Sequence, residues 1–455
     1  MASSPKFASK IGLIAATVGS AVGLGNVWRF PAETQANGGA AFLLIYIFCI
    51  FLLGIPVMTA EFALGRGGES DAAGVFSKVT PNHRHWRMAG AFSVLASYLI
   101  LSFYMVVSGW TLEYLIQSLS GNLYSGIHAG TTGEEAMFAS RMADYIASAW
   151  SPILYTAIMV IANLGILLLG VQKGIEKMSN IAMPILFIIL VIFCGVSLTL
   201  PDAAAGLEYF LKPDFSVVTP RTLINALGQA FFSLSLAMGI LVTYAAYYPP
   251  TTRLTRTAVT VSLLDLLVAI MMGVIIFPAV TSFGLTGSSL KGSTLVFVTL
   301  PEIFARMDWS SFWSALFFLL LTVAAFTSTI SLAEVSVSFV RQRLGCRRRT
   351  ACLIVVLPLL IFSPICSLSV GPWSDHTIFG LTLFDLLDTV ATNYMLPIGG
   401  ILLCIYMGWV APRSFLEAQV TNNGSFRSAV LPVILFIIRY IAPVLIAIIL
   451  LAPYF

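Results

Sequence analysis

Residues 19–31 place the strongest constraint on how this chain can fold. They read Gly-Ser-Ala-Val-Gly-Leu-Gly-Asn-Val-Trp-Arg-Phe-Pro and lie inside an apolar stretch long enough to cross a membrane. Gly23, Gly25 and Pro31 weaken a helix, and Asn26 and Arg29 bring polar groups to bilayer depth. Backbone that unwinds in hydrocarbon needs hydrogen-bond partners other than lipid. The segment therefore predicts a broken helix that faces an ion, a polar ligand or a water-filled cavity.

The composition predicts an all-α polytopic membrane protein. The chain is 58% hydrophobic and 10% charged, whereas soluble domains carry about 25% charged residues. Its apolar runs are much longer than ten residues and do not alternate, which excludes an outer-membrane barrel. Runs of about twenty apolar residues predict eleven spans. Their approximate limits are 11–31, 41–65, 88–120, 152–171, 175–200, 222–248, 254–284, 311–341, 350–370, 376–410 and 428–453.

The distribution of lysine and arginine predicts the orientation. With the N-terminus in the cytoplasm and alternating spans, seventeen basic residues fall in inner segments and five, including Lys291, in outer loops. This predicts a multi-pass protein of the cell inner (plasma) membrane with its C-terminus, Phe455, outside. The basic run at 341–349 is interpreted as a cytoplasmic anchor, with the lipid bilayer and no nucleic acid as partner. The oligomeric state is left open.

A second interrupted span lies at 228–248, where Ser233, Ser235 and Gly239 occupy mid-depth positions. Small residues also allow close helix packing, so this span alone is ambiguous. This span corresponds to the first span if spans 1–5 and spans 6–10 form a repeat. Because each copy then has five spans, an odd number, the second copy crosses the membrane in the inverted direction. The predicted parts are a first repeat at 11–200, an inverted second repeat at 222–410 and a peripheral helix at 428–453. Paired broken helices in such a repeat mark the site of a secondary transporter.

Several motifs make the chain resemble the neurotransmitter:sodium symporter family, which has the fold of the bacterial leucine transporter. The resemblance covers about residues 7–410, and within the family it is greatest to bacterial transporters of several hydrophobic amino acids, which also have eleven spans. Besides 12–31, the motifs are Gly38-Gly39-Ala-Ala-Phe42, Pro56…Glu61…Gly65-Arg66, Ser108-Gly-Trp110-Thr111-Leu112, Gln229-Ala-Phe-Phe232-Ser-Leu-Ser235-Leu, Thr327-Ser328 and Phe384-Asp385…Asp388.

The resemblance implies two sodium sites built from oxygen ligands, as a hard cation requires. The first would use the Ala21 carbonyl and the side chains of Asn26, Ser233 and Asp265. The second would use the carbonyls of Gly19, Val22 and Ala324 and the hydroxyls of Thr327 and Ser328. Taken alone, Thr327 and Ser328 would more often bond to a carbonyl of their own helix.

Asp265 departs from the pattern, because many relatives have asparagine there. Tyr46, Gln229 and Ser233 match chloride-site positions in chloride-dependent members, but Ala269 replaces a serine. A buried carboxylate in hydrocarbon is costly unless it is paired with a cation or protonated. The hypothesis is that Asp265 supplies the negative charge itself and makes transport chloride-independent. The alternative is a protonated, structural aspartic acid.

The resemblance implies a zwitterionic amino acid as substrate. Its carboxylate would meet the first sodium, the backbone N–H groups of Gly23, Leu24 and Gly25, and the Tyr104 hydroxyl. Its ammonium would meet carbonyls around Ala21, Phe232 and Ser235. The side-chain pocket would be lined by Ile100, Tyr104, Phe232, Met238 and Leu332. None of these is charged, so we expect hydrophobic L-amino acids, and the adaptable Met238 favours acceptance of both aliphatic and aromatic ones.

Gating residues follow from the same resemblance. Arg29 and Asp388 would form the outer gate, directly or through water, with Phe232 as a lid. Glu61 would hold the unwound backbone in a structural role.

On the inner side, Phe7 matches an aromatic anchor, whereas the family's cytoplasmic Arg–Asp pair is not visible and Ser4 and Gln342 fall near its positions. Gly174 and Pro184 would weaken the fifth span so that sodium leaves inward, the alternative being a static kink.

The sequence therefore predicts a sodium-coupled symporter of hydrophobic L-amino acids that works by alternating access. A channel is the second candidate, but it would need a continuous polar pore. A membrane enzyme would need a nucleophile–base or metal constellation at depth, and the sequence shows no such pattern.

Overall fold

The computed structural model describes residues 6–126, 134–285 and 292–451, without the side chains of 134–136. Lys291, Ser4 and Phe455 lie outside the described residues. Within the described ranges the regular elements are helices, apart from one isolated bridge between Ile378 and Leu381. This agrees with the all-α prediction, because a helix satisfies its own backbone polar groups in hydrocarbon.

Several membrane-spanning helices contain a π-helical stretch, and others are α-helical throughout; the label η marks π-helical and 3₁₀ segments alike. In the first half they are α1 (Lys10–Ala21), η1 (Gly25–Arg29), α2 (Phe30–Ala36), α3 (Ala40–Cys49), η2 (Ile50–Gly54), α4 (Ile55–Gly68), α6 (Arg87–Leu119), α8 (Trp150–Gly170), η5 (Val171–Glu176) and α9 (Lys177–Ser197). In the second half they are α11 (Pro220–Ser233), α12 (Ile240–Ala245), α13 (Leu254–Ser282), α16 (Ser310–Leu344), α17 (Arg348–Val356), α18 (Leu359–Val370), α19 (Leu383–Asp388), η9 (Thr389–Met395), α20 (Leu396–Ile405), η10 (Tyr406–Val410), α22 (Leu431–Phe436), η11 (Ile437–Ile441) and α23 (Ala442–Leu451).

Shorter helices connect the spans. They are α5 (Gly74–Val79), η3 (Pro81–Trp86), η4 (Asn122–Tyr124), α7 (Glu134–Ala147), α10 (Ala203–Leu211), η6 (Phe215–Val217), α14 (Gly292–Thr294), η8 (Leu295–Thr299), α15 (Leu300–Ala305) and α21 (Arg413–Val420).

The described residues contain the eleven predicted spans. Eight continuous apolar helical runs and one bent pair, α1 with η1–α2, are long enough to cross a membrane. The run Trp150–Ser197 holds two of the spans, which meet at Gly170 with its φ of 88°. The interrupted pair α11 and α12 supplies one more. The predicted limits 376–410 start too early, because residues 371–382 form turns and the helix begins only at Leu383.

Both predicted breaks are present. The first lies between Ala21 and Gly25, and the helices on its two sides differ in direction by 54°. The second lies between Ser233 and Ile240, where Ser235, Ala237 and Gly239 have positive φ values of 53°, 62° and 72°. Non-glycine residues rarely adopt such angles, so neighbouring groups must hold this backbone in place.

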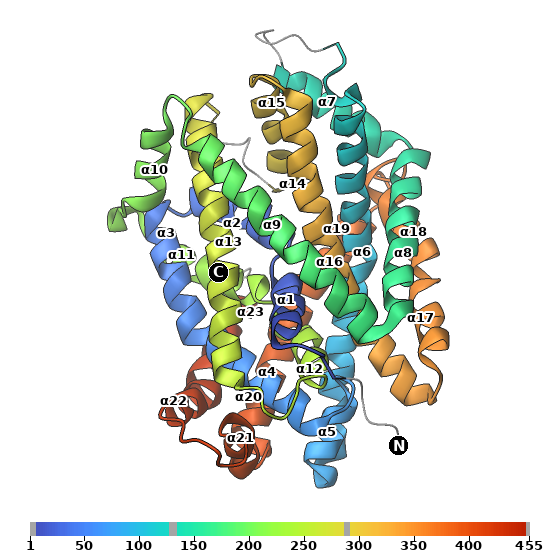
Figure 1. The fold of residues 1–455 in the computed structure, drawn as a ribbon, viewed down its shortest axis with the longest axis vertical. Coiled ribbons are helices and arrows are strands. Elements are labelled where there is room, and N and C mark those ends of the chain that lie inside the picture. The colour runs from blue at the N-terminus through green and yellow to red at the C-terminus, as the bar shows by residue number, and fades with distance from the viewer. Residues whose placement is uncertain (1–5, 127–133, 286–291, 452–455) are drawn as a thin grey trace.

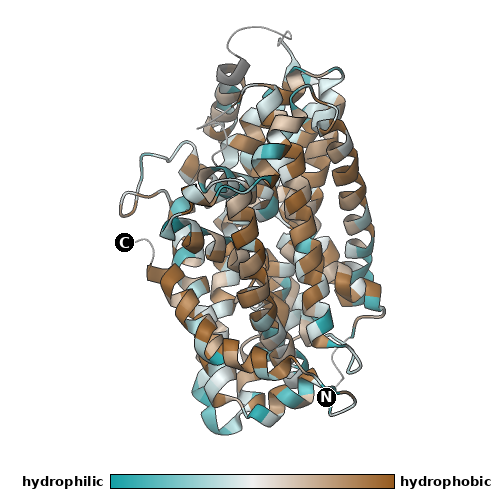
Figure 2. Cartoon of the chain, turned by 90° about the vertical axis from the view of Figure 1, so that its left-hand side faces the viewer, coloured by the Kyte–Doolittle hydropathy of each residue, from teal (hydrophilic) through white to brown (hydrophobic). Residues whose placement is uncertain are grey.

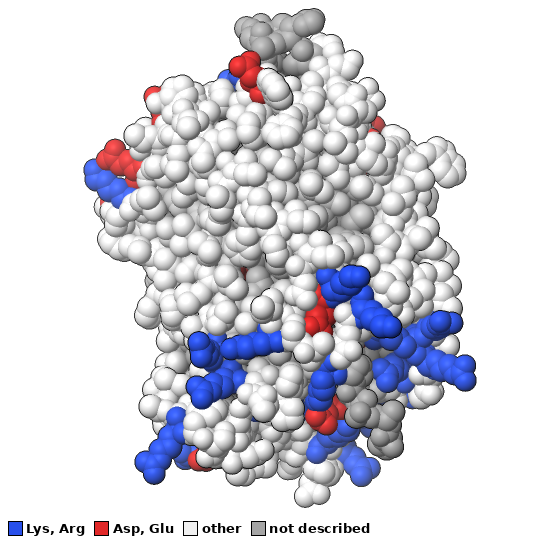
Figure 3. Space-filling model, in the orientation of Figure 1, with Lys and Arg blue, Asp and Glu red and all other residues white. Residues whose placement is uncertain are grey.

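The broken helices lie in the middle of the bundle, where α1 and α12 are surrounded by longer helices (Figure 1). α16 packs along α6, and α1 contacts α9, α13 and α16. Apolar residues cover the outer faces of the helices, and hydrophilic residues gather towards the two ends (Figure 2). On the face shown in Figure 3, lysine and arginine are concentrated near the end that carries the N-terminus, below a broad belt without charge.

Candidate substrate and sodium sites

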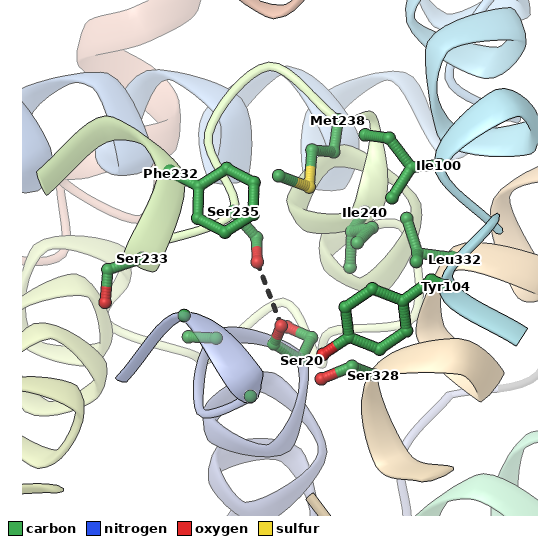
Figure 4. A pocket seen from close by; sticks show the side chains of 13 residues that line it. Ser20, Ile100, Tyr104, Phe232, Ser233, Ser235, Met238, Ile240, Ser328 and Leu332 are labelled. Atoms are coloured by element: carbon green, nitrogen blue, oxygen red, sulfur yellow. Dashed lines mark hydrogen bonds between the residues drawn. The ribbon is translucent and has the colours of Figure 1, made fainter. Parts of the chain in front are cut away.

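A small cavity lies where the two breaks meet α6 and α16 (Figure 4). Its volume is about 40 Å³. Nine of the ten residues predicted for substrate binding line it, and the tenth, Leu24, touches it through Tyr104. The lining residues are Ser20, Ala21, Gly23, Gly25, Ile100, Tyr104, Phe232, Ser233, Ser235, Met238, Ile240, Ser328 and Leu332.

Polar groups gather on the side of the cavity formed by the breaks. The Tyr104 hydroxyl accepts a hydrogen bond of 3.2 Å from the Leu24 N–H. The Ser235 hydroxyl donates to the Ser20 carbonyl over 2.9 Å and so links the two broken helices. A Cβ on Gly23 would lie 2.9 Å from the Ser328 hydroxyl oxygen, so glycine lets the backbone approach the cavity here.

The opposite side of the cavity is apolar. It is formed by Ile100, Met238, Ile240 and Leu332, and the Phe232 ring covers the cavity on its outer side (Figure 4). Within the part of the chain that the structure describes, no charged side chain lines this cavity. The arrangement suits a small zwitterion whose side chain is apolar, because a charged side chain would be buried without a partner.

Three of the four residues predicted for the first sodium site converge beside this cavity. Asn26 Nδ2 donates to Asp265 Oδ1 over 2.9 Å and to Ser233 Oγ over 3.2 Å, and Ser233 Oγ donates to Asp265 Oδ2 over 2.7 Å. Asn26 Oδ1 accepts a hydrogen bond of 3.4 Å from the Gly23 N–H. Ala21, whose carbonyl is the fourth predicted ligand, lines the same cavity as Ser233. These oxygen atoms are of the kind that sodium prefers.

Two further buried side chains adjoin this cluster. The Tyr46 hydroxyl lies beside Ser233 and Asp265. The Gln229 amide nitrogen donates to the Gly25 carbonyl over 3.2 Å, whereas Gln229 Oε1 has no hydrogen-bond partner among the described residues. Unpaired buried polar atoms are rare and need an explanation. A bound ion or water would provide the partner of Gln229 Oε1.

The residues predicted for the second sodium site also come together, across α1 and α16. Ser328 Oγ lies 3.4 Å from the Gly19 carbonyl oxygen and 3.5 Å from that of Val22. Thr327 Oγ1 lies 3.0 Å from the Ala324 carbonyl oxygen. Two carbonyls at the break of the first span therefore face the Ser328 hydroxyl of α16, while the Thr327 hydroxyl and the Ala324 carbonyl bond to each other within α16.

The outer side of the cavity is covered by Phe232 and Arg29. The Arg29 guanidinium lies 4.8 Å from the centre of the Phe232 ring, a cation–π contact. Arg29 and Asp388, both within the described ranges, face each other but form no direct ion pair. Above this layer lies a cavity of about 140 Å³ that Arg29 and Glu33 line. The structure is therefore closed at this level, with room for water outside the lid.

Glu61 supports the second break. Its Oε1 accepts a hydrogen bond of 2.9 Å from the Ala237 N–H, which belongs to the left-handed stretch after Ser233. The structure brings Glu61 to the backbone of the sixth span. It records no bond from Glu61 to the described backbone of the first span.

The end of the bundle that carries the N-terminus holds the predicted aromatic residue Phe7, which is buried against Tyr244 and Tyr247. A second contact there was not predicted from the sequence. The Arg348 guanidinium donates two hydrogen bonds, of 2.9 and 2.7 Å, to the buried carboxylate of Glu334. Tyr247 also donates to that carboxylate, over 2.8 Å. This network closes the inner end between α12, α16 and α17. Gln342 makes a different contact, accepting from Ser70 over 2.7 Å.

The predicted hinge of the fifth span contains a π-helical turn that holds the N-terminal segment. Gly174 lies in this turn, and a Cβ there would lie 2.2 Å from the Ile166 carbonyl oxygen, while Pro184 lies inside α9. The buried Glu176 carboxylate accepts from the N–H of Ala8 over 2.8 Å and from the N–H and hydroxyl of Ser9 over 3.0 and 2.9 Å. Sequence reasoning missed Glu176, because nothing in its immediate neighbourhood points to residues 8 and 9.

Two cavity residues were also missed. Ser20 contributes a carbonyl, and Ile240 is the first residue of α12. Ser20 belongs to the interrupted segment that the sequence singles out, so its position could have been included. Ile240 follows the left-handed Gly239, and only the conformation of that glycine turns it towards the cavity.

Two interrupted helices that meet at a central cavity, among long apolar helices, define a secondary transporter. Comparisons with known proteins give the family. Residues 4–126 and 140–454 match the model of the sodium:neurotransmitter symporter family. The chain belongs to that family, which consists of sodium-coupled transporters and not enzymes.

Individual relatives agree with this assignment. The chain is 35% identical to the uncharacterized sodium-dependent transporter YhdH of Bacillus subtilis, over 98% of this chain and 96% of that protein. It is 33% identical to the uncharacterized sodium-dependent transporter MJ1319 of Methanocaldococcus jannaschii, over 93% of this chain and 85% of the relative. Among solved structures, it is similar to MhsT in complex with L-phenylalanine, with a TM-score of 0.88, 39% identity and 99% of both chains covered.

Proposed function

We propose that this transporter carries hydrophobic L-amino acids together with sodium. The observation that carries the proposal is the central cavity, in which exposed backbone and hydroxyls from both helix breaks face an apolar wall of Ile100, Met238 and Leu332. The similarity to a structure that holds L-phenylalanine supports the same substrate class. Met238 is flexible and can adapt its shape, so both aliphatic and aromatic side chains fit the proposal.

The polar ends of the substrate would lie against the breaks. The N–H groups of Gly23, Leu24 and Gly25 and the hydroxyl of Tyr104 face the side where a carboxylate would lie, next to the first sodium. Carbonyls around Ala21, Phe232 and Ser235 would accept from the ammonium. Helix ends favour these charges, because free N–H groups attract anions and free carbonyls attract cations.

We propose two sodium sites with the ligand sets described above. The support is geometric. Asn26, Ser233 and Asp265 contact one another from three different helices, and Ser328 contacts the carbonyls of Gly19 and Val22. In the first set, the Asp265 carboxylate would offset the charge of the ion. We therefore propose that transport does not require chloride. The buried Ala269, one turn further along α13, offers no hydroxyl to an anion.

We further propose which residues close the outer side, where sodium is released, and which end of the protein faces the cytoplasm. Arg29, Asp388 and Phe232 would close the outer side, and the turn around Gly174 would loosen, with Pro184, to release sodium inward. The concentration of lysine and arginine at one end favours that end as cytoplasmic. The two repeats, 11–200 and 222–410, would move relative to each other, with 428–453 outside them.

Equilibrium binding to the purified protein tests the substrate class. L-leucine and L-phenylalanine should bind in sodium buffer and lose affinity when choline replaces sodium, whereas L-glutamate and L-lysine should not bind. Leu332→Asp is the matched variant, since it places a carboxylate in the apolar wall without touching the breaks. It should abolish leucine binding. Binding of L-glutamate equal to that of L-leucine in the wild type would overturn the proposed substrate class.

A further inference from the structure

A second, larger cavity opens at the end of the bundle that carries the N-terminus. It lies between the start of α1 and the start of α13 and has a volume of about 570 Å³, within the range of pockets that bind small molecules. It is separate from the central cavity and shares no lining residue with it. Its walls are Ala8, Ser9, Lys10, Leu13, Ile14, Pro249, Thr251, Thr252, Arg253, Arg256, Thr257 and Thr260.

The charge of this cavity is entirely positive. Lys10, Arg253 and Arg256 line it, and none of its lining residues, all of which the structure describes, is acidic. Among the described residues no ion pair is recorded for these three side chains, and the Arg253 guanidinium lies 5.0 Å from the centre of the Phe426 ring. Three cations without an acidic partner around one cavity would repel each other, so an anion bound between them would be stabilised.

The loop that carries this charge is held firmly from behind. The Arg66 guanidinium donates to the carbonyls of Pro250 and Thr252, over 3.3 and 2.6 Å, and Asn422 Nδ2 donates to the Thr251 carbonyl over 3.1 Å. The carbonyls of the loop are therefore turned away and occupied. The Thr251 and Thr252 side chains remain on the cavity side, where hydroxyls can donate to an anion.

The surface beside the cavity identifies the source of the anion. Leu263 and Leu267 follow Arg256 by seven and eleven residues, so all three lie on one face of α13, and both leucines are 44% exposed. At a rise of about 1.5 Å per residue, they lie roughly 10 and 16 Å further into the bilayer. Ile11, next to Lys10, is 76% exposed. A molecule in the cavity would have its charge among the cations and an apolar tail along α13.

We propose that this cavity binds the phosphate headgroup of an anionic phospholipid from the leaflet that the basic end of the protein faces. Lys10, Arg253 and Arg256 contact the phosphate, and one acyl chain lies along Leu263 and Leu267. The headgroup also contacts Ala8 and Ser9, whose N–H groups donate to Glu176. The lipid therefore holds the N-terminal segment against the fifth span. This inference does not depend on the transported substrate.

The test is binding of phosphatidylglycerol to the purified protein in detergent, measured by native mass spectrometry. Phosphatidylcholine with the same acyl chains and sn-glycerol 3-phosphate serve as the neutral-lipid and free-phosphate probes. The double variant Arg253→Gln/Arg256→Gln should bind phosphatidylglycerol about 25-fold more weakly, since each basic residue near an anionic surface contributes roughly a factor of five. The control Arg347→Gln/Arg349→Gln removes two exposed arginines that do not line the cavity and should bind like the wild type.

Three results would overturn the proposal: equal weakening in both double variants, equal binding of phosphatidylcholine and phosphatidylglycerol by the wild type, or competition by sn-glycerol 3-phosphate as strong as that by the lipid. Should the double variant not fold, Arg256→Gln alone should weaken phosphatidylglycerol about fivefold. As a second readout, phosphatidylglycerol at a concentration that half-saturates the wild type should slow hydrogen exchange of residues 8–14 in the wild type and slow it less in Arg256→Gln. Slowing of equal size in both proteins would also contradict the assignment.

Discussion

Asn26 lies in the broken first span and Asp265 in the continuous helix α13, yet the amide nitrogen of Asn26 donates to the carboxylate of Asp265 over 2.9 Å. Asp265 is fully buried, and within the described chain its side chain contacts polar neutral groups but no basic one. A buried carboxylate in this position needs a cation or a proton. The arrangement is explained if sodium binds beside it and the carboxylate compensates the charge.

This relationship predicts how the chloride requirement changes. Asp265→Asn should lower sodium affinity in chloride-free buffer, because the first site loses its only carboxylate. In the double variant Asp265→Asn/Ala269→Ser, added chloride should recover part of the lost affinity, since a hydroxyl then joins Tyr46 and Gln229. Sodium titration of substrate binding in chloride and in gluconate measures both effects. An unchanged sodium affinity of Asp265→Asn in gluconate would falsify the role of the carboxylate.

The second sodium site predicts a different signature. Ser328→Ala removes one hydroxyl that faces the Gly19 and Val22 carbonyls, without changing the apolar wall. A contact with a charged group contributes about 1.5–3 kcal/mol, so the sodium concentration for half-maximal binding should rise roughly tenfold to a hundredfold. Thr322→Ala is the control, because that hydroxyl bonds only to its own helix, at Phe318. Equal sodium curves for Ser328→Ala and the wild type would remove Ser328 from the ligand set.

The inner network predicts unequal effects on stability. Arg348→Gln leaves the buried Glu334 carboxylate without its cation, which should cost about 3–5 kcal/mol and lower the melting temperature in detergent. The double variant Glu334→Gln/Arg348→Gln should lose less, because no buried charge is left unpaired.

Lys6 and Glu69 provide the comparison for this prediction. They form a more exposed ion pair of 2.6 Å, and Glu69→Gln should cost below about 1 kcal/mol. A single Arg348→Gln variant as stable as the double variant would show that the charge of Glu334 is satisfied in another way.

Glu176 predicts a link between the N-terminal segment and the fifth span. Glu176→Ala removes the acceptor for two N–H groups and one hydroxyl of residues 8 and 9, so hydrogen exchange should become faster in residues 7–12 and 171–176. Lys173→Ala changes an exposed side chain in the same turn and should leave exchange as in the wild type. Faster exchange confined to residues 171–176 would mean that the two segments are not coupled.

The sequence was sufficient for features that have a local signal. The two breaks could be predicted because Gly23, Gly25 and Gly239 interrupt apolar stretches, and the cavity residues followed from motifs around them. The start of the tenth span was predicted too early, because Ile378 and Phe379 raise the hydropathy of a stretch that in fact turns.

Contacts between distant segments carry no such signal. The pairing of Glu176 with Ala8 and Ser9, and of Glu334 with Arg348, depends on how the helices pack. A buried glutamate in an apolar helix indicates only that some partner is needed. The sequence therefore shows that a buried glutamate needs a partner, and only the packing of the helices shows which residue that partner is.

Uptake into proteoliposomes tests the central proposal most directly. Labelled L-leucine and L-tryptophan are supplied with and without an inward sodium gradient, in chloride and in gluconate. We expect both amino acids to accumulate above equilibrium only when the sodium gradient is present, with equal rates in the two anions. Accumulation that ignores the sodium gradient would contradict the two sodium sites and point to another driving ion or to a channel.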